Sequence, residues 1–232
     1  MTTGPQHSRL FRAIAFLSRL RLAYVFRNTS NPQIPVVGFV FTAGATALAT
    51  ITIAAHLTEL PLLFPPLGPT AFILFYTPMS ESASPRSAIM AHTMAVVAGT
   101  ASLWLVELAF PHANITDPAS MNWYRVVAIA MSMGLTGAGM ILLRSVHPPA
   151  AASALIAAMG YLGNATQIVG LPAAVVLLVF EAFLFNRLLG GLPYPVWKAD
   201  TRISRMYGML AGIPDDRTTF WHQLTGTIFE RR

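Results

Sequence analysis

Two short proline-led stretches decide the fold of this chain: PPLGPTAFI at residues 65–73 and PPAAASALI at residues 148–156. Aligned without a gap, they are offset by 83 residues and share both prolines, a hydroxyl residue, an alanine and an isoleucine. Each lies between two long apolar stretches. Proline is favoured in the first turn of a helix, where its missing N–H would be unpaired in any case. Each stretch therefore predicts the start of a short helix.

The composition around these stretches is that of a membrane protein. Of the 232 residues, 54% are hydrophobic and only 10% are charged, and the mean hydropathy is +0.57. A soluble domain usually carries roughly a quarter of its residues as charges. The chain has no cysteine, which excludes a disulfide scaffold, a cysteine zinc site, an iron–sulfur cluster and a thiol nucleophile.

Four long apolar stretches are predicted to span the bilayer: residues 36–57, 86–110, 123–143 and 164–188. Each is near the ~20 residues that cross a hydrocarbon core of ~30 Å. The two proline-led segments, roughly residues 64–76 and 147–160, are shorter. At ~1.5 Å per helical residue they reach only ~20 Å, so they cannot cross the core as regular helices alone.

The basic residues choose between two topologies, four crossings with re-entrant short segments or six crossings. The formal charge is +6, and the bases gather toward both ends of the chain, which predicts cytoplasmic termini and argues against nucleic-acid binding. With six crossings, the connections that hold Arg86 and Arg144 are cytoplasmic and the base-free stretch 111–122 is outside. Four crossings invert these assignments, so the positive-inside rule favours six.

The predicted fold is an all-α integral membrane protein with six segments in a 3+3 inverted repeat, as found in transporters. The middle segment of each repeat is a short half-helix that begins at a Pro-Pro pair. Residues 36–189 form this domain, with repeats at about 36–110 and 123–188. Residues 1–35 are a cytoplasmic arm with an amphipathic interfacial helix over residues 10–26, and residues 190–232 are a cytoplasmic tail.

A half-helix that starts inside the membrane turns unpaired N–H groups and a positive dipole end toward the protein interior. Two such ends that face each other would form an anion site. The candidate substrate-binding residues are the following: Gly68, Thr70, His92, Ala151, His147 and Ser153. The alternative is that the prolines merely start two buried helices and that the histidines are packing residues.

Three charged residues are candidates for gating or for lining a vestibule. Arg86 and Arg144 lie at the predicted cytoplasmic helix ends, and Glu181 lies deep in the last span. An ionisable group inside a bilayer is a functional candidate by default. Their structural alternatives are topology signals for the arginines and a helix–helix contact for Glu181. The histidines show no metal-ligand spacing, so we expect neither a metal nor another cofactor.

The sequence also resembles a known family. The run RSVHPPAAASAL at residues 144–155 resembles the signature of the HPP family of integral membrane proteins. PLGPTAFILF at residues 66–75 and SPRSAIMAH at residues 84–92 are similar to earlier elements of that family, in the same order. The resemblance implies a membrane transport protein, since some members are linked to nitrite movement across bacterial and plastid membranes.

These observations lead to the hypothesis of a bacterial inner-membrane channel or secondary transporter for a small monovalent anion, with nitrite as the first candidate. Its expected partners are the lipid bilayer and the anion, and a homo-oligomer is left open. We expect no enzymatic activity, because no nucleophile elbow is present. The alternatives are an intramembrane enzyme that uses Ser145 or Ser153 with a histidine, and a non-transporting assembly partner.

Overall fold

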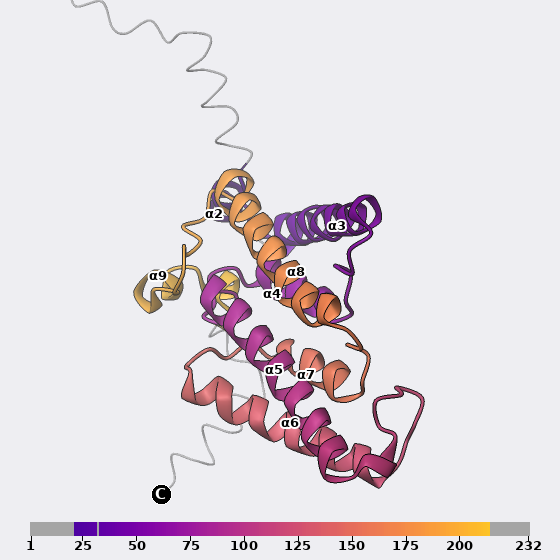
Figure 1. Cartoon of the computed structure of the whole chain (residues 1–232). Helices are drawn as coiled ribbons and strands as arrows, with labels where there is room; N and C mark the ends of the chain where they lie inside the picture. The colour runs from indigo at the N-terminus through magenta and orange to yellow at the C-terminus, as the bar shows by residue number, and fades with distance from the viewer. Residues whose placement is uncertain (1–20, 32, 214–232) are drawn as a thin grey trace, which may run out of the picture.

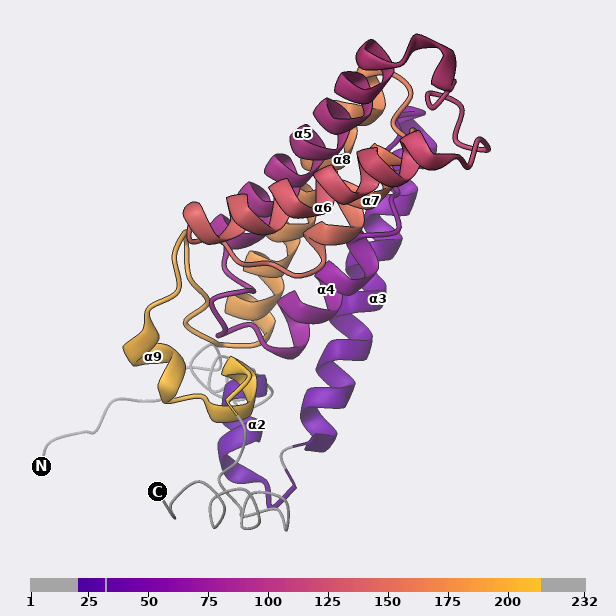
Figure 2. The ribbon, with the colours of Figure 1, turned by 90° about the horizontal axis from the view of Figure 1, so that it is seen from below.

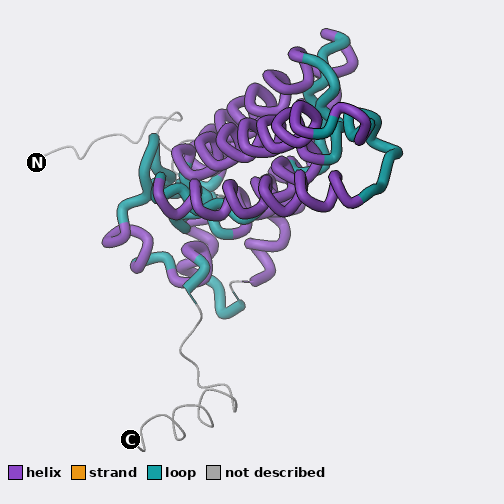
Figure 3. Tube along the Cα trace, turned by 60° about the horizontal axis from the view of Figure 1, so that its bottom comes forward, coloured by secondary structure: helices purple, strands orange, loops and turns teal. Residues whose placement is uncertain are grey.

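The computed structural model describes residues 21–31 and 33–213, and these residues form helices and loops without any strand (Figure 3). Four helices are long and apolar enough to cross a membrane. They are α3 (Gln33–Thr58), α5 (Pro85–Ala109), α6 (Trp123–Leu142) and α8 (Ala165–Leu184), the last continued by a π-helical turn, Phe185–Leu189. The all-helical prediction and the four long spans are confirmed.

Local capping residues fix where three of these helices begin. The Ser84 hydroxyl accepts a hydrogen bond from the backbone N–H of Ser87, with Pro85 in the first turn of α5. Asn122 caps α6 and Asn164 caps α8 in the same way. A side-chain oxygen at this position satisfies an N–H group that has no partner within the helix.

The two proline-led segments form short helices, α4 (Leu67–Tyr76) and α7 (Ala150–Ala158). Neither has a side-chain cap, and each begins directly after the second proline of its pair, Pro66 or Pro149. Both prolines have right-handed helical dihedral angles. A short helix therefore begins at each of the two Pro-Pro pairs.

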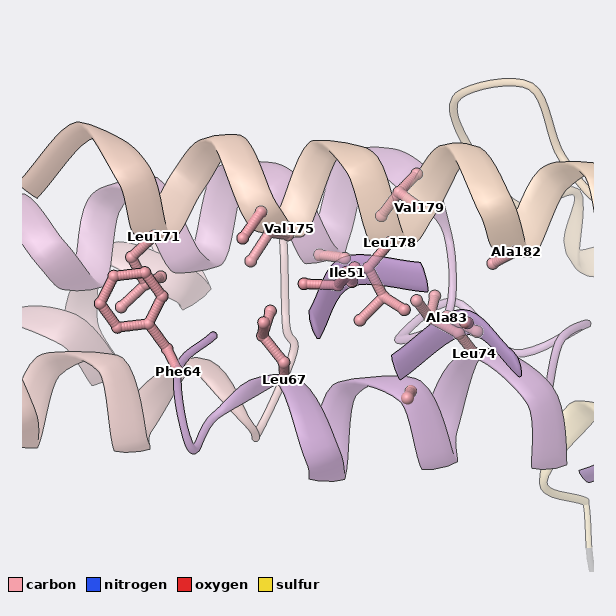
Figure 4. Packing of buried hydrophobic residues seen from close by; sticks show 14 of the residues in the cluster. Ile51, Phe64, Leu67, Leu74, Ala83, Leu171, Val175, Leu178, Val179 and Ala182 are labelled. Carbon is pink, nitrogen blue, oxygen red and sulfur yellow. The ribbon is translucent and has the colours of Figure 1, made fainter. Parts of the chain in front are cut away.

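The short helices lie among the long ones. Helix α4 packs against α3 and α8, and α7 packs against α5 and α6 (Figure 1). The largest apolar cluster joins the first group: Leu67 and Leu74 of α4 point toward Leu171 and Leu178 of α8, with Ile51 of α3 beside them (Figure 4). Burial of such side chains stabilises the bundle by about 1.5–3 kcal/mol each.

One glycine sets the distance between α5 and α7. A Cβ atom placed on Gly99 would lie 2.5 Å from the Cβ of Ala157 and 2.6 Å from the backbone oxygen of Ala154. These separations are too short for any side chain. Gly99 therefore lets the two helix backbones approach closely, as small residues commonly do in membrane helix packing.

The molecule has two distinct ends (Figure 2). At one end, which we call the terminal end, α2 (Leu22–Asn28) and α9 (Thr201–Arg205) lie near each other. A small apolar cluster holds the segments at this end together. Its buried members are Leu22, Val36, Met79, Leu192 and Leu210. Residues 190–213 thus pack on the bundle instead of trailing from it. Most of the predicted amphipathic segment, residues 10–20, lies outside the described residues.

The opposite end, which we call the loop end, carries the connection between α5 and α6 (Figure 2). This connection includes a short 3-10 turn, Pro111–Ala113. Along their length, the outward faces of the long helices expose large apolar side chains, including Phe41, Leu108, Trp123 and Ile141. Exposed apolar surface on this scale suits contact with lipid.

Candidate functional site

Two hydroxyl groups from the short helices meet on one histidine. Thr70 is the fourth residue of α4, and Ser153 is the fourth residue of α7. The His92 ring, in the second turn of α5, lies between them: its Nε2 atom is 2.8 Å from Thr70 Oγ1, and its Nδ1 atom is 2.7 Å from Ser153 Oγ. All three side chains are fully buried. A single imidazole thus joins the two half-helices.

A second buried histidine extends this contact. The Nε2 atom of His147 is 3.2 Å from Thr70 Oγ1, and its Nδ1 atom is 2.8 Å from the backbone oxygen of Ser82. The two imidazole rings are 5.1 Å apart between centroids. We call the four side chains of Ser153, His92, Thr70 and His147 the histidine chain. It runs from α7 through α5 and α4 to the connection between α6 and α7, where His147 lies.

The backbone at the two helix starts differs from the prediction of unpaired N–H groups. In α4 the N–H groups of Leu67 and Gly68 donate to the carbonyls of Phe64 and Pro65. In α7 the corresponding donors are Ala150, Ala151 and Ala152, which bond to the carbonyls of His147, Pro148 and Pro149. Because the capping prolines are themselves helical, the preceding carbonyls are aligned to accept these bonds. The prediction of free N–H donors at these positions was wrong.

The remaining predicted substrate-binding residues lie beside the histidine chain in sequence but not in it. Gly68 and Ala151 are both half-buried in the first turns of α4 and α7. A Cβ atom on Gly68 would meet nothing within 4 Å, so the space beside this residue is open. Gly68 is therefore not required for close packing of the protein itself.

The three predicted vestibule residues do not form one group. The Arg86 guanidinium donates to the backbone oxygens of Leu143 and Arg144, which completes the C-terminal end of α6. The Arg144 side chain is exposed. Glu181 lies on α8 and is buried, and its Oε2 atom has no hydrogen-bond partner.

Sequence reasoning missed a structural role for Arg125. Its guanidinium is fully buried at the loop end and donates to the backbone oxygens of Ser120, Asp117 and Ala158 and to the Ser120 hydroxyl. It therefore fastens the α5–α6 connection to the C-terminal end of α7. The sequence signal for this role was an isolated arginine in the first turn of a predicted span, three residues after the capping asparagine.

The electrostatic setting of the histidine chain favours negative charge. Thr70 and Ser153, which contact His92, both lie in the first turn of their helices, so the positive dipole ends of α4 and α7 are near His92. Among the described residues, no carboxylate is hydrogen-bonded to any of the four side chains. The backbone oxygen of Ser82 accepts a hydrogen bond from His147. The side-chain hydroxyl of Ser82 is buried without a hydrogen-bond partner. In residues 21–31 and 33–213, no group of three or more His, Cys, Asp or Glu could hold a metal ion.

Comparisons with known proteins agree with this picture of a membrane protein. A transmembrane protein of Dictyostelium discoideum is 25% identical over 174 residues, which are 72% of this chain and 57% of that protein. A second transmembrane protein of the same organism is 25% identical over 132 residues, covering 55% of this chain and 39% of the relative. The chain thus spans about two fifths to three fifths of these relatives.

No solved structure matches the chain. The family model described as "HPP, transmembrane region" matches residues 29–195, a range that includes all four long helices, both short helices and the whole histidine chain. The chain therefore belongs to the HPP transmembrane family.

Proposed function

We propose that the protein is a channel or secondary transporter for a small monovalent anion, with nitrite as the first candidate. The observation that carries the proposal is the histidine chain, a fully buried polar group at the starts of two short helices inside an apolar bundle. Polar and ionisable groups are expensive in a membrane and mark substrate pathways there.

The chemistry of the chain supports an anion as the substrate. Imidazole groups and the dipole ends of α4 and α7 can supply positive potential to an oxyanion that has lost its water, and a buried hydroxyl without a partner can donate a hydrogen bond to it. The Ser82 hydroxyl, which is buried without a hydrogen-bond partner, offers a further donor next to His147, whose Nδ1 atom contacts the Ser82 backbone oxygen. In this proposal the anion is held by side chains and dipoles and not by free backbone N–H groups.

We propose six crossings in two inverted repeats, and the contacts of the short helices support this. Helix α4 packs on α3 of its own half and on α8 of the other, and α7 packs on α6 of its own half and on α5 of the other. Thr70 and Ser153, which are 83 residues apart, hold equivalent positions. The histidines have no equivalents, since the same offset pairs His92 with Val175 and His147 with Phe64.

The loop before α5 also supports six crossings. The backbone N–H of Met79 donates to the oxygen of Leu210, and the N–H of Arg86 donates to that of Trp197. This loop therefore lies at the terminal end, beside the segments that the positive-inside rule places in the cytoplasm. Four crossings would put the loop and the tail on opposite sides of the membrane. We propose a bacterial inner-membrane location with both termini cytoplasmic.

Purified protein in proteoliposomes tests the transport proposal. We expect vesicles with protein to take up nitrite faster than protein-free vesicles. Uptake of nitrate, formate and chloride, measured in the same way, gives the selectivity of the protein among the four anions. Protein-free vesicles are essential because nitrous acid crosses lipid by itself. Absence of protein-dependent flux for all four anions would overturn the proposal.

A matched pair of histidine variants separates function from folding. His147→Asn keeps a donor for the Ser82 oxygen but removes the contact with Thr70, so we expect nitrite flux to fall while the protein elutes as the wild type does in gel filtration. His112→Asn is the control, since His112 is exposed at the loop end, where it contacts Tyr124. Equal flux in the two variants would exclude His147 from the pathway.

One contact favours a second candidate, an intramembrane serine hydrolase. Ser153 Oγ lies 2.7 Å from His92 Nδ1, within reach for activation of the hydroxyl. Against it, Ser153 is fully buried and the first-turn N–H groups of α7 are already bonded, so they offer no oxyanion hole. We propose a non-enzymatic role, and covalent labelling of Ser153 by a fluorophosphonate, absent in Ser153→Ala, would contradict it.

A further inference from the structure

We propose that the histidine chain takes up one proton together with each anion, so that the protein is a proton–anion symporter in which the Thr70 hydroxyl switches between two acceptors. This inference rests on the proposed transport function and adds the coupling ion to it. It is carried by the hydrogen-bonding geometry of four buried side chains.

The Thr70 hydroxyl lies within hydrogen-bonding distance of three partners. Its Oγ1 atom lies 2.8 Å from the Pro66 backbone oxygen, 2.8 Å from His92 Nε2 and 3.2 Å from His147 Nε2. A hydroxyl has one hydrogen to donate and can accept two more. If the Thr70 hydrogen points to Pro66, both histidines must donate to the Thr70 oxygen.

A count of hydrogens shows that the chain is one proton short when both histidines are neutral. Five contacts join the chain and its backbone acceptors, and each needs one hydrogen. Two neutral imidazoles and two hydroxyls supply one each, four in all. The Ser82 oxygen can only accept, so the hydrogen of neutral His147 is on Nδ1. Its Nε2 must then accept from Thr70, which leaves the Pro66 oxygen without this donor.

One added proton completes all five contacts. The proton comes from water at the membrane surface and forms an N–H bond at His147 Nε2. The Thr70 hydroxyl then turns its hydrogen from His147 to the Pro66 oxygen, and the Thr70 oxygen accepts from both imidazoles. Release reverses these steps: the N–H bond of Nε2 breaks, the proton returns to water on the other side, and Thr70 again donates to His147.

The charged and titratable groups around His147 leave this proton without a fixed counter-charge. Among the described residues, His92 of α5 faces the His147 ring directly. Arg86, also on α5, turns its guanidinium to the end of α6, and the Arg144 and Glu81 side chains are exposed. On the tail, the hydroxyl of Tyr194 donates to the oxygen of Ala83. None of these groups supplies a negative charge within hydrogen-bonding contact of His147.

A buried imidazolium without a carboxylate partner is costly, and a buried anion without a cation is costly as well. Each therefore stabilises the other when both occupy the site, and this coupling is reciprocal by thermodynamic necessity. The pair crosses with no net charge. The structure thereby accounts for symport, in which neither the proton nor the anion is bound well alone.

Proteoliposomes loaded with a pH-sensitive dye test the coupling. Nitrite and nitrate are the probes, and nitrate is included because its acid is too strong to leak as the neutral form. We expect an inside-alkaline pH gradient to drive anion accumulation, one proton to enter per anion, and a potassium–valinomycin potential to have no effect. Flux that follows the membrane potential and ignores the pH gradient would overturn symport and leave the transport proposal intact. No protein-dependent flux of either anion would remove both.

Variants of Thr70 assign the proton to this chain. Thr70→Val removes the hydroxyl with little change of shape, and we expect gradient-driven uptake to fall by about tenfold or more because the two histidines lose their link. Thr70→Ser, which keeps the hydroxyl, should restore it. Thr93→Val is the matched control, since Thr93 is exposed on α5 and its hydroxyl bonds only within its own helix, to the Ile89 oxygen.

The variants are decisive even if one folds poorly. Gel filtration identifies a misfolded variant. The number of protons that enter per anion in the wild type then decides the question of symport without that variant. Well-folded Thr70→Val that retains one proton per anion would overturn the assignment of the proton to the histidine chain. Loss of coupling in Thr93→Val as well would also overturn it, because that hydroxyl is not part of the chain.

Discussion

Arg125 carries its positive charge into a fully buried position at the loop end and is bonded there to neutral oxygens. Replacement by methionine leaves at least three backbone oxygens without this donor. Because an unpaired buried polar group costs about 1–3 kcal/mol, we expect Arg125→Met to lower the free energy of unfolding by roughly 3 kcal/mol or more. Thermal unfolding in detergent measures the change.

The exposed Arg144 provides the control for this prediction. Arg144→Met removes the same charge without burying an unpaired group, so we expect little change in thermal unfolding. An equal loss of stability in both variants would mean that net charge, and not the hydrogen bonds of Arg125, stabilises the protein.

Tyr194 makes the stability depend on pH. Its hydroxyl donates to the Ala83 oxygen at 2.6 Å, and burial raises the pKa of this hydroxyl well above its usual range. In the unfolded chain a tyrosine loses its proton near pH ~10. The contribution of Tyr194 is therefore fully present below that pH and is lost as the pH rises toward the folded pKa.

Tyr194→Phe isolates this effect. At pH 8 we expect the variant to be less stable by about 1 kcal/mol, because the Ala83 oxygen loses its donor. Above pH ~10 the wild type should lose stability relative to the variant, which has no proton to release there. Thermal unfolding of both proteins across this range is the measurement, and a constant difference at all pH values would contradict the assignment.

At the scale of helices, the closest approach of α5 to α7 depends on Gly99. We expect Gly99→Ala to destabilise the protein by about 1–3 kcal/mol, since the new methyl group would overlap a Cβ atom and a backbone oxygen. The clash also moves Ser153 away from His92, so anion flux should fall with stability. Thermal unfolding and proteoliposome flux are measured on the same preparation.

Gly134→Ala is the matched control within α6. A Cβ atom at this position meets nothing within 4 Å. Alanine is favoured over glycine in a helix by about 1 kcal/mol, so this variant should be as stable as the wild type or more stable. The two substitutions are chemically identical, and an equal loss of stability in both variants would contradict the role of Gly99 in packing.

The helices show which parts of the fold could be predicted from sequence. The span predicted at residues 123–143 is observed as Trp123–Leu142, because apolar length and a capping asparagine are local features. The pairing of Thr70 with His92 and His147 joins residues 22 and 77 positions apart. Such contacts depend on how α4, α5 and α7 pack, which the local pattern does not contain.

The candidate site was predicted in part for the same reason. Its proline-led helix starts identified Thr70 and Ser153 as residues in first turns, and the intramembrane rule identified His92 and His147. Their mutual contacts could not be read from the sequence. The prediction of free N–H groups failed because Pro66 and Pro149 have helical dihedral angles, which align the carbonyls before them to accept from the first N–H groups of each helix.

For the whole molecule, the absence of cysteine makes the proposed topology easy to test. Glu81 lies in the loop before α5, and Ala119 lies in the connection at the loop end; both are exposed. With six crossings and cytoplasmic termini, a membrane-impermeant maleimide should label Ala119→Cys in intact cells and label Glu81→Cys only after permeabilisation.

The reversed labelling pattern would favour four crossings, and labelling of both positions from one side would contradict both topologies. Cysteine-free wild-type protein gives the background. Thr201→Cys, on the exposed surface of α9, should behave as Glu81→Cys does, because the tail and the loop before α5 meet at the terminal end.

In the proposed inverted repeat, the two halves of the molecule share a scaffold but not its chemistry. Val175 stands where His92 would be in the second half, and Phe64 stands where His147 would be in the first. If transport exchanges the conformations of the two repeats, the polar groups repack against different neighbours in the inward-open and outward-open forms. The two forms then differ in free energy. Unequal resting populations follow, and the protein would work as a rectifier whose forward and reverse rates differ under equal gradients.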